Sequence, residues 1–319
     1  MTDPTDRITL ITGASGFLGA HVVAAACARS QQEATMSEPL GPLVVAQTRS
    51  PALLAPRFST PRDAAQWIET ELLDGGALRL LERVMPTEVI HCAAMARGAE
   101  CESEPEAAQL LNGILPGEIG AWCEEHGARF VHVSTDLVFG ADDAPKDGFR
   151  ETDAPGPLST YGVTKLAGER AALAACPMAT IARLPLLYGN SGGRGLGASD
   201  SILEKVEQAD RPALFVDEWR TPLEVSNAAA ALVELLEFDH AGPVHLAGPT
   251  RITRFDFGIA VLKSMGMSEP DARASVDAAL QSDMEGPPRP RDVSLNATQA
   301  ATSLDTRLLS VRDGLLAAL

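Results

Sequence analysis

A strand, a turn with evenly spaced glycines and a helix follow one another near the start of this 319-residue chain. The strand is expected at residues 7–12, and the turn that follows places Gly13, Gly16 and Gly19 three residues apart. The first glycine permits a tight turn, the second lets the backbone approach a pyrophosphate, and the third allows close helix–strand packing. The N–H groups at the helix start then face the phosphates. This order predicts a dinucleotide-binding unit, with cofactor contacts from Gly13, Ser15, Gly16, Phe17, Leu18 and Gly19.

Strand and helix patterns alternate over the first 189 residues and become weaker afterwards, where residues 192–197 are rich in glycine. Such alternation predicts βαβ units and a parallel sheet. We expect an α/β fold, with a Rossmann-type doubly wound parallel sheet in residues 1–189 and a smaller C-terminal substrate-binding lobe, interleaved with it, in residues 190–319. The expected strands are 7–12, 43–47, 70–73, 88–92, 129–134, 178–184 and 243–247, and the expected helices are 17–29, 76–84, 104–126, 159–175, 201–208, 224–238, 254–265 and 305–319.

Composition excludes several classes of protein. Acidic residues outnumber basic ones 43 to 26, and the net charge of −17 repels the phosphates of nucleic acids. No apolar run approaches the ~20 residues that span a bilayer, so no membrane association is expected. The first residues lack the pattern of a signal peptide. Five cysteines without Cys-x-x-Cys spacing predict reduced thiols, no metal site and a cytoplasmic protein.

The residues after the second strand bear on the choice of nicotinamide cofactor. NAD-binding proteins usually place a carboxylate there for the ribose 2′-OH, whereas an arginine suits a 2′-phosphate. This chain has Arg49 and Ser50 at that point and no carboxylate. The pair favours NADP(H) over NAD(H), and the alternative is that Arg49 is a solvated loop residue.

Tyr161 and Lys165 are four residues apart near the start of an expected helix, so they share one helical face. A lysine ammonium there can hold a ribose and favour the phenolate of the tyrosine. Because the ordinary tyrosine pKa is about 10, such a neighbour would make Tyr161 a usable proton donor to a carbonyl oxygen. With so few tyrosines and lysines, the spacing has roughly a 3% probability of arising by chance. The alternative is a surface pair.

Polar residues at the ends of two expected buried strands are further candidates, because ligands of open α/β sheets bind beyond the carboxyl ends of the strands. Thr135, or Ser134 beside it, could hydrogen-bond a substrate carbonyl, unless it only caps the strand. For His91 the position favours a buried, hydrogen-bonded histidine over a catalytic base. Asn112 is a poor helix former inside an expected helix. It would hold a water, bend the helix for a proton relay, or mark a local kink.

These motifs together resemble the extended short-chain dehydrogenase/reductases. The glycine turn, Thr135 and Tyr161-x-x-x-Lys165 carry the likeness to the superfamily, and residues 150–165 resemble its nucleotide-sugar branch. Within that branch, residues 134–139, 217–222 and 289–296 are similar to dTDP-4-dehydrorhamnose reductases. Sugar-nucleotide dehydratases usually have a catalytic glutamate where this chain has Leu137. The resemblance covers almost the whole chain.

The resemblance implies roles for individual residues. Thr135, Tyr161 and Lys165 would form the catalytic set, with Asn112 in support. Where the family often has Asp-Leu or Asp-Val for adenine, this chain has Glu71-Leu72. The further implied cofactor contacts are Arg49, Ser50, Glu71, Leu72, Cys92, Ala93, Ala94, Tyr161, Lys165 and Leu186, and the implied substrate contacts are Thr135, Asp136, Arg220, Thr221 and Arg289.

The expected activity is NAD(P)H-dependent reduction of a keto group on a nucleotide-linked sugar. Tyr161 would protonate the oxygen, and Arg220 and Arg289 would bind a diphosphate unless they form ion pairs. One alternative is a sugar-nucleotide epimerase that retains NAD. Another is a non-catalytic NADP-binding regulatory subunit, similar to the partner of methionine adenosyltransferase. The expected helices at 104–126 and 159–175 are candidates for a homodimer interface.

Overall fold

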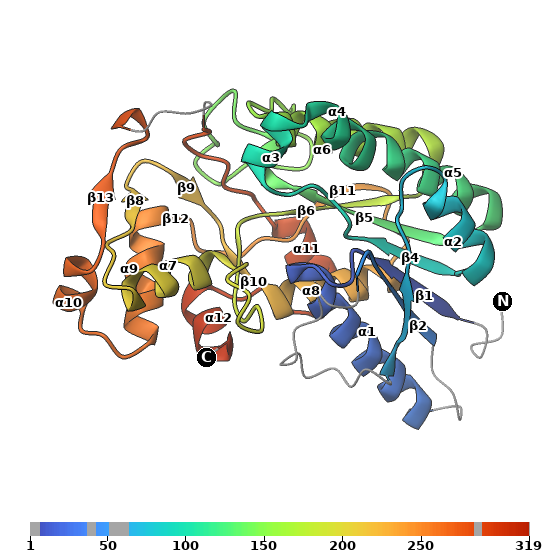
Figure 1. The fold of residues 1–319 in the computed structure, drawn as a ribbon, viewed down its shortest axis with the longest axis horizontal. Coiled ribbons are helices and arrows are strands. Elements are labelled where there is room, and N and C mark those ends of the chain that lie inside the picture. The colour runs from blue at the N-terminus through green and yellow to red at the C-terminus, as the bar shows by residue number, and fades with distance from the viewer. Residues whose placement is uncertain (1–6, 37–42, 51–63, 284–288, 319) are drawn as a thin grey trace.

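A seven-stranded parallel sheet forms the centre of the molecule (Figure 1). The computed structural model describes residues 7–36, 43–50, 64–283 and 289–318. The strands of the sheet are β1 (Ile8–Thr12), β2 (Leu43–Thr48), β3 (Gln66–Glu69), β4 (Glu88–His91), β5 (Arg129–Thr135), β6 (Thr180–Leu184) and β11 (Gly242–His245). They are arranged in the order β11-β6-β5-β4-β1-β2-β3, and every neighbouring pair is parallel. Successive strands are added on one side of β1 up to β3 and on the other side from β4 onward, so the predicted Rossmann-type doubly wound sheet is confirmed.

Helices cover both faces of the sheet (Figure 1). Alternate residues of a strand point to opposite faces, so strands covered on both sides are apolar in both positions. The helices of these layers are α1 (Phe17–Met36) and α8 (Val225–Glu234) on one face, and α2 (Gly76–Val84), α5 (Leu115–His126) and α6 (Thr160–Ala175) on the other. In β5, for example, Val131 packs in the core with α1 and α8, and Phe130 packs in the core with α2 and α5.

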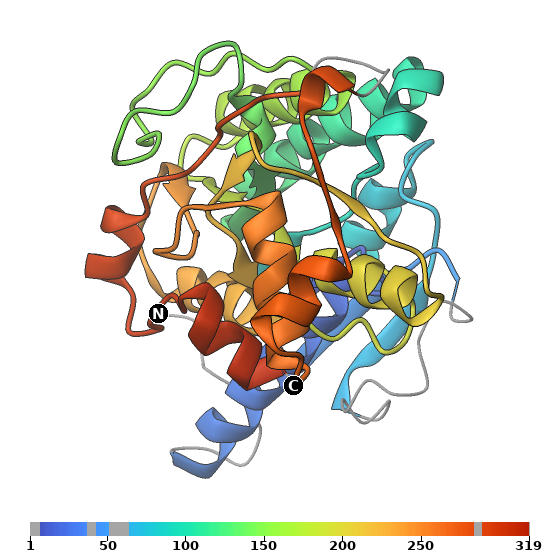
Figure 2. The ribbon, with the colours of Figure 1, turned by 90° about the vertical axis from the view of Figure 1, so that its left-hand side faces the viewer.

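A smaller lobe lies at one end of the sheet and faces the viewer in Figure 2. Its core contains Tyr188, Phe257 and Leu315. The chain returns from this lobe to the sheet at β11, so residues after 190 belong to both parts; the division at residue 189 stays a prediction. The lobe and its connections contain β7 (Leu187–Tyr188), α7 (Ala198–Glu207), β8 (Ala213–Phe215), β9 (Trp219–Arg220), β10 (Leu223–Glu224), β12 (Ile252–Thr253), α9 (Arg254–Ser264), α10 (Glu269–Ala274), β13 (Asp277–Ala279), α11 (Thr298–Ser303) and α12 (Val311–Ala318).

Two elements in the first half differ from expectation. The third strand is β3, which lies ahead of the expected residues 70–73; partly buried Trp67 packs against the core on one face of the sheet, and buried Ile68 packs in the core on the other. Helix α1 continues to Met36 rather than ending near residue 29, because Gln31, Gln32 and Glu33 are good helix formers. Residues 37–42 of the expected loop and residues 51–63 of the expected irregular segment lie outside the described residues.

The expected helix at 104–126 is interrupted. It consists of α4 (Pro105–Ala108), a π-helical turn (Gln109–Ile114) and α5, preceded by α3 (Gly98–Ser103). The last helix begins at Val311 rather than at residue 305, because the N–H groups of Asp305 and Thr306 donate to the Glu234 carboxylate instead of starting a helix. Within the described ranges, no helix combines the length and the apolar character needed to cross a membrane.

Candidate active site

The glycine turn between β1 and α1 forms a cradle at the carboxyl end of the sheet. Gly13 has a φ of +66°, and a Cβ there would lie 2.7 Å from the Cα of Ala93. Its N–H donates to the Gln47 side chain over 2.9 Å, which fixes the turn against β2. Gly16 is exposed at the mouth of the turn. The cradle thus has the bare backbone and free helix start that a dinucleotide diphosphate needs.

The end of β2 presents hydroxyl groups and a cation beside this cradle. The Thr48 hydroxyl donates to the Ser50 carbonyl over 3.0 Å and lies 2.8 Å from the Ser15 hydroxyl, which can donate to it. Arg49 is exposed. Among residues 43–50, therefore, no carboxylate is available for a ribose 2′-OH.

The two residues predicted to contact adenine do not both face this region. Leu72 is buried and packs against Ala77 and Leu80 in the core, so its side chain is not available to a cofactor. Leu72 belongs to the core because its apolar side chain packs against the first turns of α2. Glu71 is exposed, and its carboxylate accepts from the N–H of Leu72 over 3.1 Å.

Asn112 positions the loop that follows β4. Its side chain accepts from the Met95 N–H over 2.9 Å and donates to the Met95 carbonyl over 3.0 Å. A third bond, of 3.3 Å, goes to the Thr164 hydroxyl on α6. Cys92, Ala93 and Ala94 form the start of that loop and are partly buried. Asn112 is fully buried, and its side chain clamps the backbone next to the cradle. Of the alternatives expected for this residue, the local distortion of the helix is present, as the π-helical turn that contains it.

Tyr161 and Lys165 lie in the first turns of α6, whose N-terminus is capped by Ser159. Lys165 is almost fully buried, and its Nζ lies 3.2 Å from Nε2 of His132. Burial lowers the pKa of Lys165 to about 8. The expected lowering of the Tyr161 pKa is not found: burial raises the pKa, the Asp136 carboxylate raises it further, and a hydrogen bond with Thr135 opposes them. Tyr161 is accordingly a protonated hydroxyl group in the cofactor-free protein.

Thr135 ends β5 next to Tyr161, and Asp136 begins the 3-10 turn that follows. The Thr135 hydroxyl donates to the Asp136 carboxylate over 3.1 Å and accepts from the N–H of Leu137 over 3.2 Å. Ser134 points to the other side and donates to Glu169, so Thr135 is the hydroxyl at the site. Burial raises the pKa of Asp136 to about 6, although Arg220, at 3.8 Å, lowers it.

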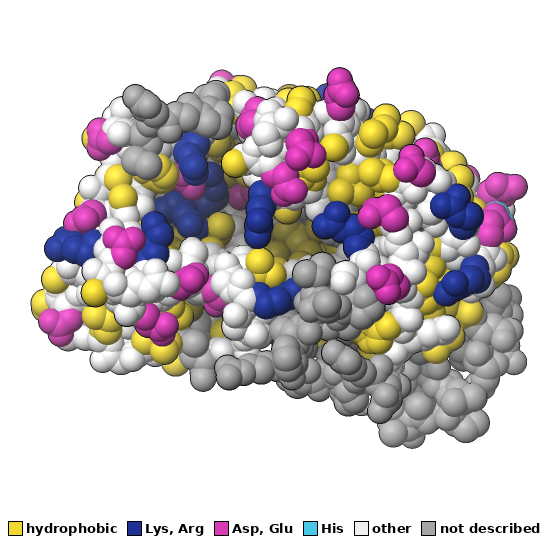
Figure 3. All heavy atoms as spheres, viewed as in Figure 1, with side chains coloured by type: hydrophobic (Ala, Val, Ile, Leu, Met, Phe, Trp, Pro, Cys, Tyr) yellow, Lys and Arg dark blue, Asp and Glu magenta, His cyan; other side chains and the backbone are white. Residues whose placement is uncertain are grey.

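Basic side chains gather in a hollow between the lobes, whose floor is partly apolar (Figure 3). Arg220 is buried and held by Glu218 at 3.2 Å and by Asp136, so the ion-pair alternative applies to it. Arg289 is exposed and lies over the Phe215 ring at 5.5 Å. Burial lowers the pKa of Arg254, and the charges of Arg220 and Arg289 lower it further, whereas Glu218 raises it.

Arg254 was missed in the sequence. Its Nη1 is buried without a hydrogen-bond partner in the described part of the chain. A signal existed: Arg254 is the first residue of α9, where a cation opposes the helix dipole and is unfavourable unless it serves another purpose.

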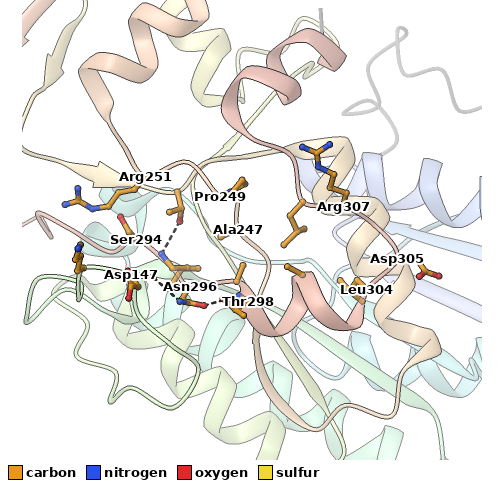
Figure 4. Close-up of a pocket in the computed structure, with 18 residues that line it drawn as sticks. Asp147, Ala247, Pro249, Arg251, Ser294, Asn296, Thr298, Leu304, Asp305 and Arg307 are labelled. Atoms are coloured by element: carbon orange, nitrogen blue, oxygen red, sulfur yellow. Dashed lines mark hydrogen bonds between the residues drawn. The ribbon is translucent and has the colours of Figure 1, made fainter.

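Thr221 does not reach this hollow with its side chain. Its hydroxyl accepts from the N–H of Leu295 over 3.1 Å and lines a different cavity of about 490 Å³, which contains none of Thr135, Tyr161 and Lys165 (Figure 4). Leu186, expected near the nicotinamide, is partly buried in the turn after β6, where its carbonyl accepts from Leu223.

The glycine-rich segment at 190–197 folds back onto the cradle. A guanidinium N–H of Arg194 donates to the carbonyl of Ser15, and the Asn190 carbonyl lies 2.8 Å from Nε2 of His21 on α1. A Cβ on Gly197 would lie 3.0 Å from the Phe17 ring. The segment therefore places a cation at the turn expected to bind a diphosphate.

Comparison with known families agrees with this geometry. The chain matches the model of the RmlD substrate binding domain over residues 7–319. It belongs to this family. The predicted resemblance to dTDP-4-dehydrorhamnose reductases is thereby confirmed. Among solved structures, this RmlD family member is similar to a dTDP-4-dehydrorhamnose reductase from Bacillus anthracis in complex with NADP, with a TM-score of 0.77 and 20% identity over 98% of both chains, a likeness of fold.

Relatives of this RmlD family member include reductases and a subunit of another enzyme. It is 32% identical over 311 residues to the probable low-salt glycan biosynthesis reductase Agl14 of Haloferax volcanii, covering 96% of this chain and 95% of that one. It is 30% identical to the dTDP-4-keto-6-deoxy-D-glucose reductase of Streptomyces niveus, covering 82% and 80%. It is also 30% identical to methionine adenosyltransferase 2 subunit beta of Xenopus tropicalis, covering 85% and 76%.

Proposed function

We propose that this protein is a nicotinamide-dependent reductase of a keto group on a nucleotide-linked sugar. The observation that carries the proposal is the meeting of Thr135, Tyr161 and Lys165 beyond the glycine cradle, at the carboxyl ends of the strands. A purely regulatory protein has no need of this set. Membership of a family with reductases such as that of Streptomyces niveus supports the same substrate class.

The side chains divide the reaction between them. When bound, the reduced nicotinamide supplies a hydride to the carbonyl carbon. Tyr161 donates its proton to the carbonyl oxygen, and the raised pKa keeps that proton in place until the oxygen becomes basic. Thr135 turns its hydroxyl from Asp136 to the same oxygen and orients it. Lys165 holds the ribose and provides the positive charge that favours the phenolate after transfer.

The binding of the two phosphate-bearing ligands follows from the charges around the site. Arg254 and Arg289 bind the substrate diphosphate, which the acidic surface elsewhere would repel. Arg49 and the hydroxyls of Ser15 and Ser50 bind the 2′-phosphate of NADPH, which we infer to be the preferred cofactor. The exposed position of Arg49 and the absence of a carboxylate in residues 43–50 support that preference.

Two finer properties belong to the same proposal. All five cysteines are free thiols, four of them buried, as expected of a cytoplasmic protein. A homodimer through α5 and α6 stays a prediction; Val163 on α6 and Ile114 just before α5 are large apolar side chains exposed on this layer.

The test is NADPH oxidation by the purified protein with a panel of dTDP-4-keto-6-deoxy sugars, followed at 340 nm for each substrate. We expect turnover of at least one sugar, with Tyr161→Phe slower by about 10²–10⁴-fold because the proton donor is lost. NADPH binding by the variant should be retained. Net NADPH consumption distinguishes the reductase from an NAD-retaining epimerase. Absence of turnover across the panel, with Tyr161→Phe functional in cells, would instead favour the regulatory subunit.

A further inference from the structure

Four polar side chains form a row beneath the site, from the last residues of β1 and β4 through the middle of β5 to α6. Thr12, His91 and His132 occupy paired positions on these neighbouring parallel strands. The Thr12 hydroxyl lies 2.7 Å from Nδ1 of His91, and the two imidazole rings stack at 5.4 Å. At the other end, Nε2 of His132 meets Nζ of Lys165 at 3.2 Å. All four side chains are buried.

The chemistry of Lys165 and His132 determines which of them donates the hydrogen bond. A lysine ammonium can only donate, so Nε2 of His132 must be the unprotonated ring nitrogen. Burial, with the Lys165 charge next in effect, lowers the pKa of His132 well below its ordinary value, so the ring is neutral and able to accept. Its Nδ1 is buried without a hydrogen-bond partner among the described residues. A buried ring nitrogen without a hydrogen-bond partner is unfavourable for stability, and such a group in a core calls for an explanation such as a role in a functional site.

The other groups around Lys165 leave His132 as its acceptor. Glu169, one turn further along α6, raises the Lys165 pKa, but its carboxylate is bound by Ser134 and Arg183. At the end of β4, burial lowers the pKa of His91 to about 3, and in the loop that follows it raises that of Cys92 to about 12, so both are neutral at pH 7. Tyr161 lies one turn earlier on α6 and is protonated.

We propose that His132 is a positioning residue that accepts one N–H of Lys165, holds the amine in its charged form and leaves its other two N–H groups for the cofactor ribose. The proposal rests on the proposed function. Without this acceptor, a buried ammonium loses one of its few partners. Its pKa then falls, and the fraction of charged lysine near neutral pH falls with it.

The small number of lysines makes a direct test possible. Lysine labelled with ¹³C at Cε gives one signal for each of Lys146, Lys165, Lys205 and Lys263, and Lys165→Arg assigns the buried one. In the cofactor-free wild type, the Lys165 signal should titrate near pH 8. His132→Phe should lower the Lys165 midpoint by about one unit. His132→Gln, whose amide reaches the position of Nε2, should restore it to within about half a unit.

Two outcomes would overturn the proposal: a folded His132→Phe protein with the wild-type Lys165 midpoint, or a His132→Gln protein whose midpoint falls as far as that of the Phe variant. If Phe prevents folding, His132→Asn replaces it, because the asparagine amide ends short of Nε2 and predicts the same fall. The alkaline limb of kcat/KM should move with the lysine midpoint. The titration needs neither substrate nor turnover, so failure of the reductase assay and failure of this proposal are separate results.

Discussion

Asp136 is a buried carboxyl group next to the Tyr161 hydroxyl, and its environment is costly. Only about 4% of the residue is exposed, and its Oδ2 has no hydrogen-bond partner among the described residues. Arg220 compensates in part, but burial still raises the pKa to about 6. Keeping this carboxylate ionised at neutral pH stores unfavourable free energy at the site, as is common where a side chain is retained for function rather than stability.

We expect Asp136→Asn to stabilise the protein. The carboxyl pKa is higher in the folded state than in the unfolded state, so its contribution is favourable at low pH and is lost as the pH rises through about 6. Removing the charge should therefore raise the free energy of unfolding by about 3 kcal/mol at pH 8, and by much less near pH 4. Urea unfolding of both proteins at the two pH values measures this. A gain independent of pH would contradict the assignment.

At the scale of the elements, the sequence predicts those helices and turns that are determined by residues close together in the chain. The helix at Gly76–Val84 has the expected bounds, and the glycine turn forms where its spacing places it. By contrast, β3 depends on pairing with β2, and no short-range pattern places it at Gln66–Glu69. The π-helical turn likewise arises from a contact across the chain, because Asn112 reaches back to Met95.

We expect Asn112→Ala to loosen the loop after β4. The Met95 N–H and carbonyl lose their partner, which should lower the free energy of unfolding by about 1–3 kcal/mol. The affinity for NADPH should fall as well, because the loop borders the glycine cradle. Calorimetric unfolding and fluorescence titration with NADPH measure the two effects. Leu110→Ala, an exposed position on the same turn, is the control and should change neither.

At the scale of the whole molecule, the site is assembled from segments that are distant in sequence. Tyr161 and Lys165 could be found because one helical turn separates them. Arg254 and His132 could not be assigned roles in the same way, because their partners Glu218 and Lys165 lie in other elements. The sequence alone therefore points to the pair that we propose to be catalytic, whereas the groups that we propose to tune it can be found only in the folded chain.

The contact between the glycine-rich segment and the cradle should be part of cofactor binding. Arg194 brings a positive charge to the Ser15 carbonyl, where the diphosphate is expected. Arg194→Met should raise the Kd for NADPH about tenfold, a change of about 1.4 kcal/mol, and should reduce its dependence on salt. Fluorescence titrations at low and high salt test this. Arg211→Met is a matched control, because it removes an equal charge from an exposed pair with Asp277; an equal effect of both variants would refute a specific role.

The return of the chain to the sheet at β11 also bears on how the protein folds during synthesis. A nascent chain that ends at residue 189 already contains six strands of the sheet, but β6 has an open edge and α1 lacks the cover of α8. Open edges and bare apolar faces pair with other chains. A fragment of residues 1–189 should therefore aggregate, whereas the full chain should stay dispersed, as light scattering can show. β11 is added about 60 residues later. Until then, the nascent chain depends on chaperones, or on staying attached to the ribosome, to avoid pairing with other chains.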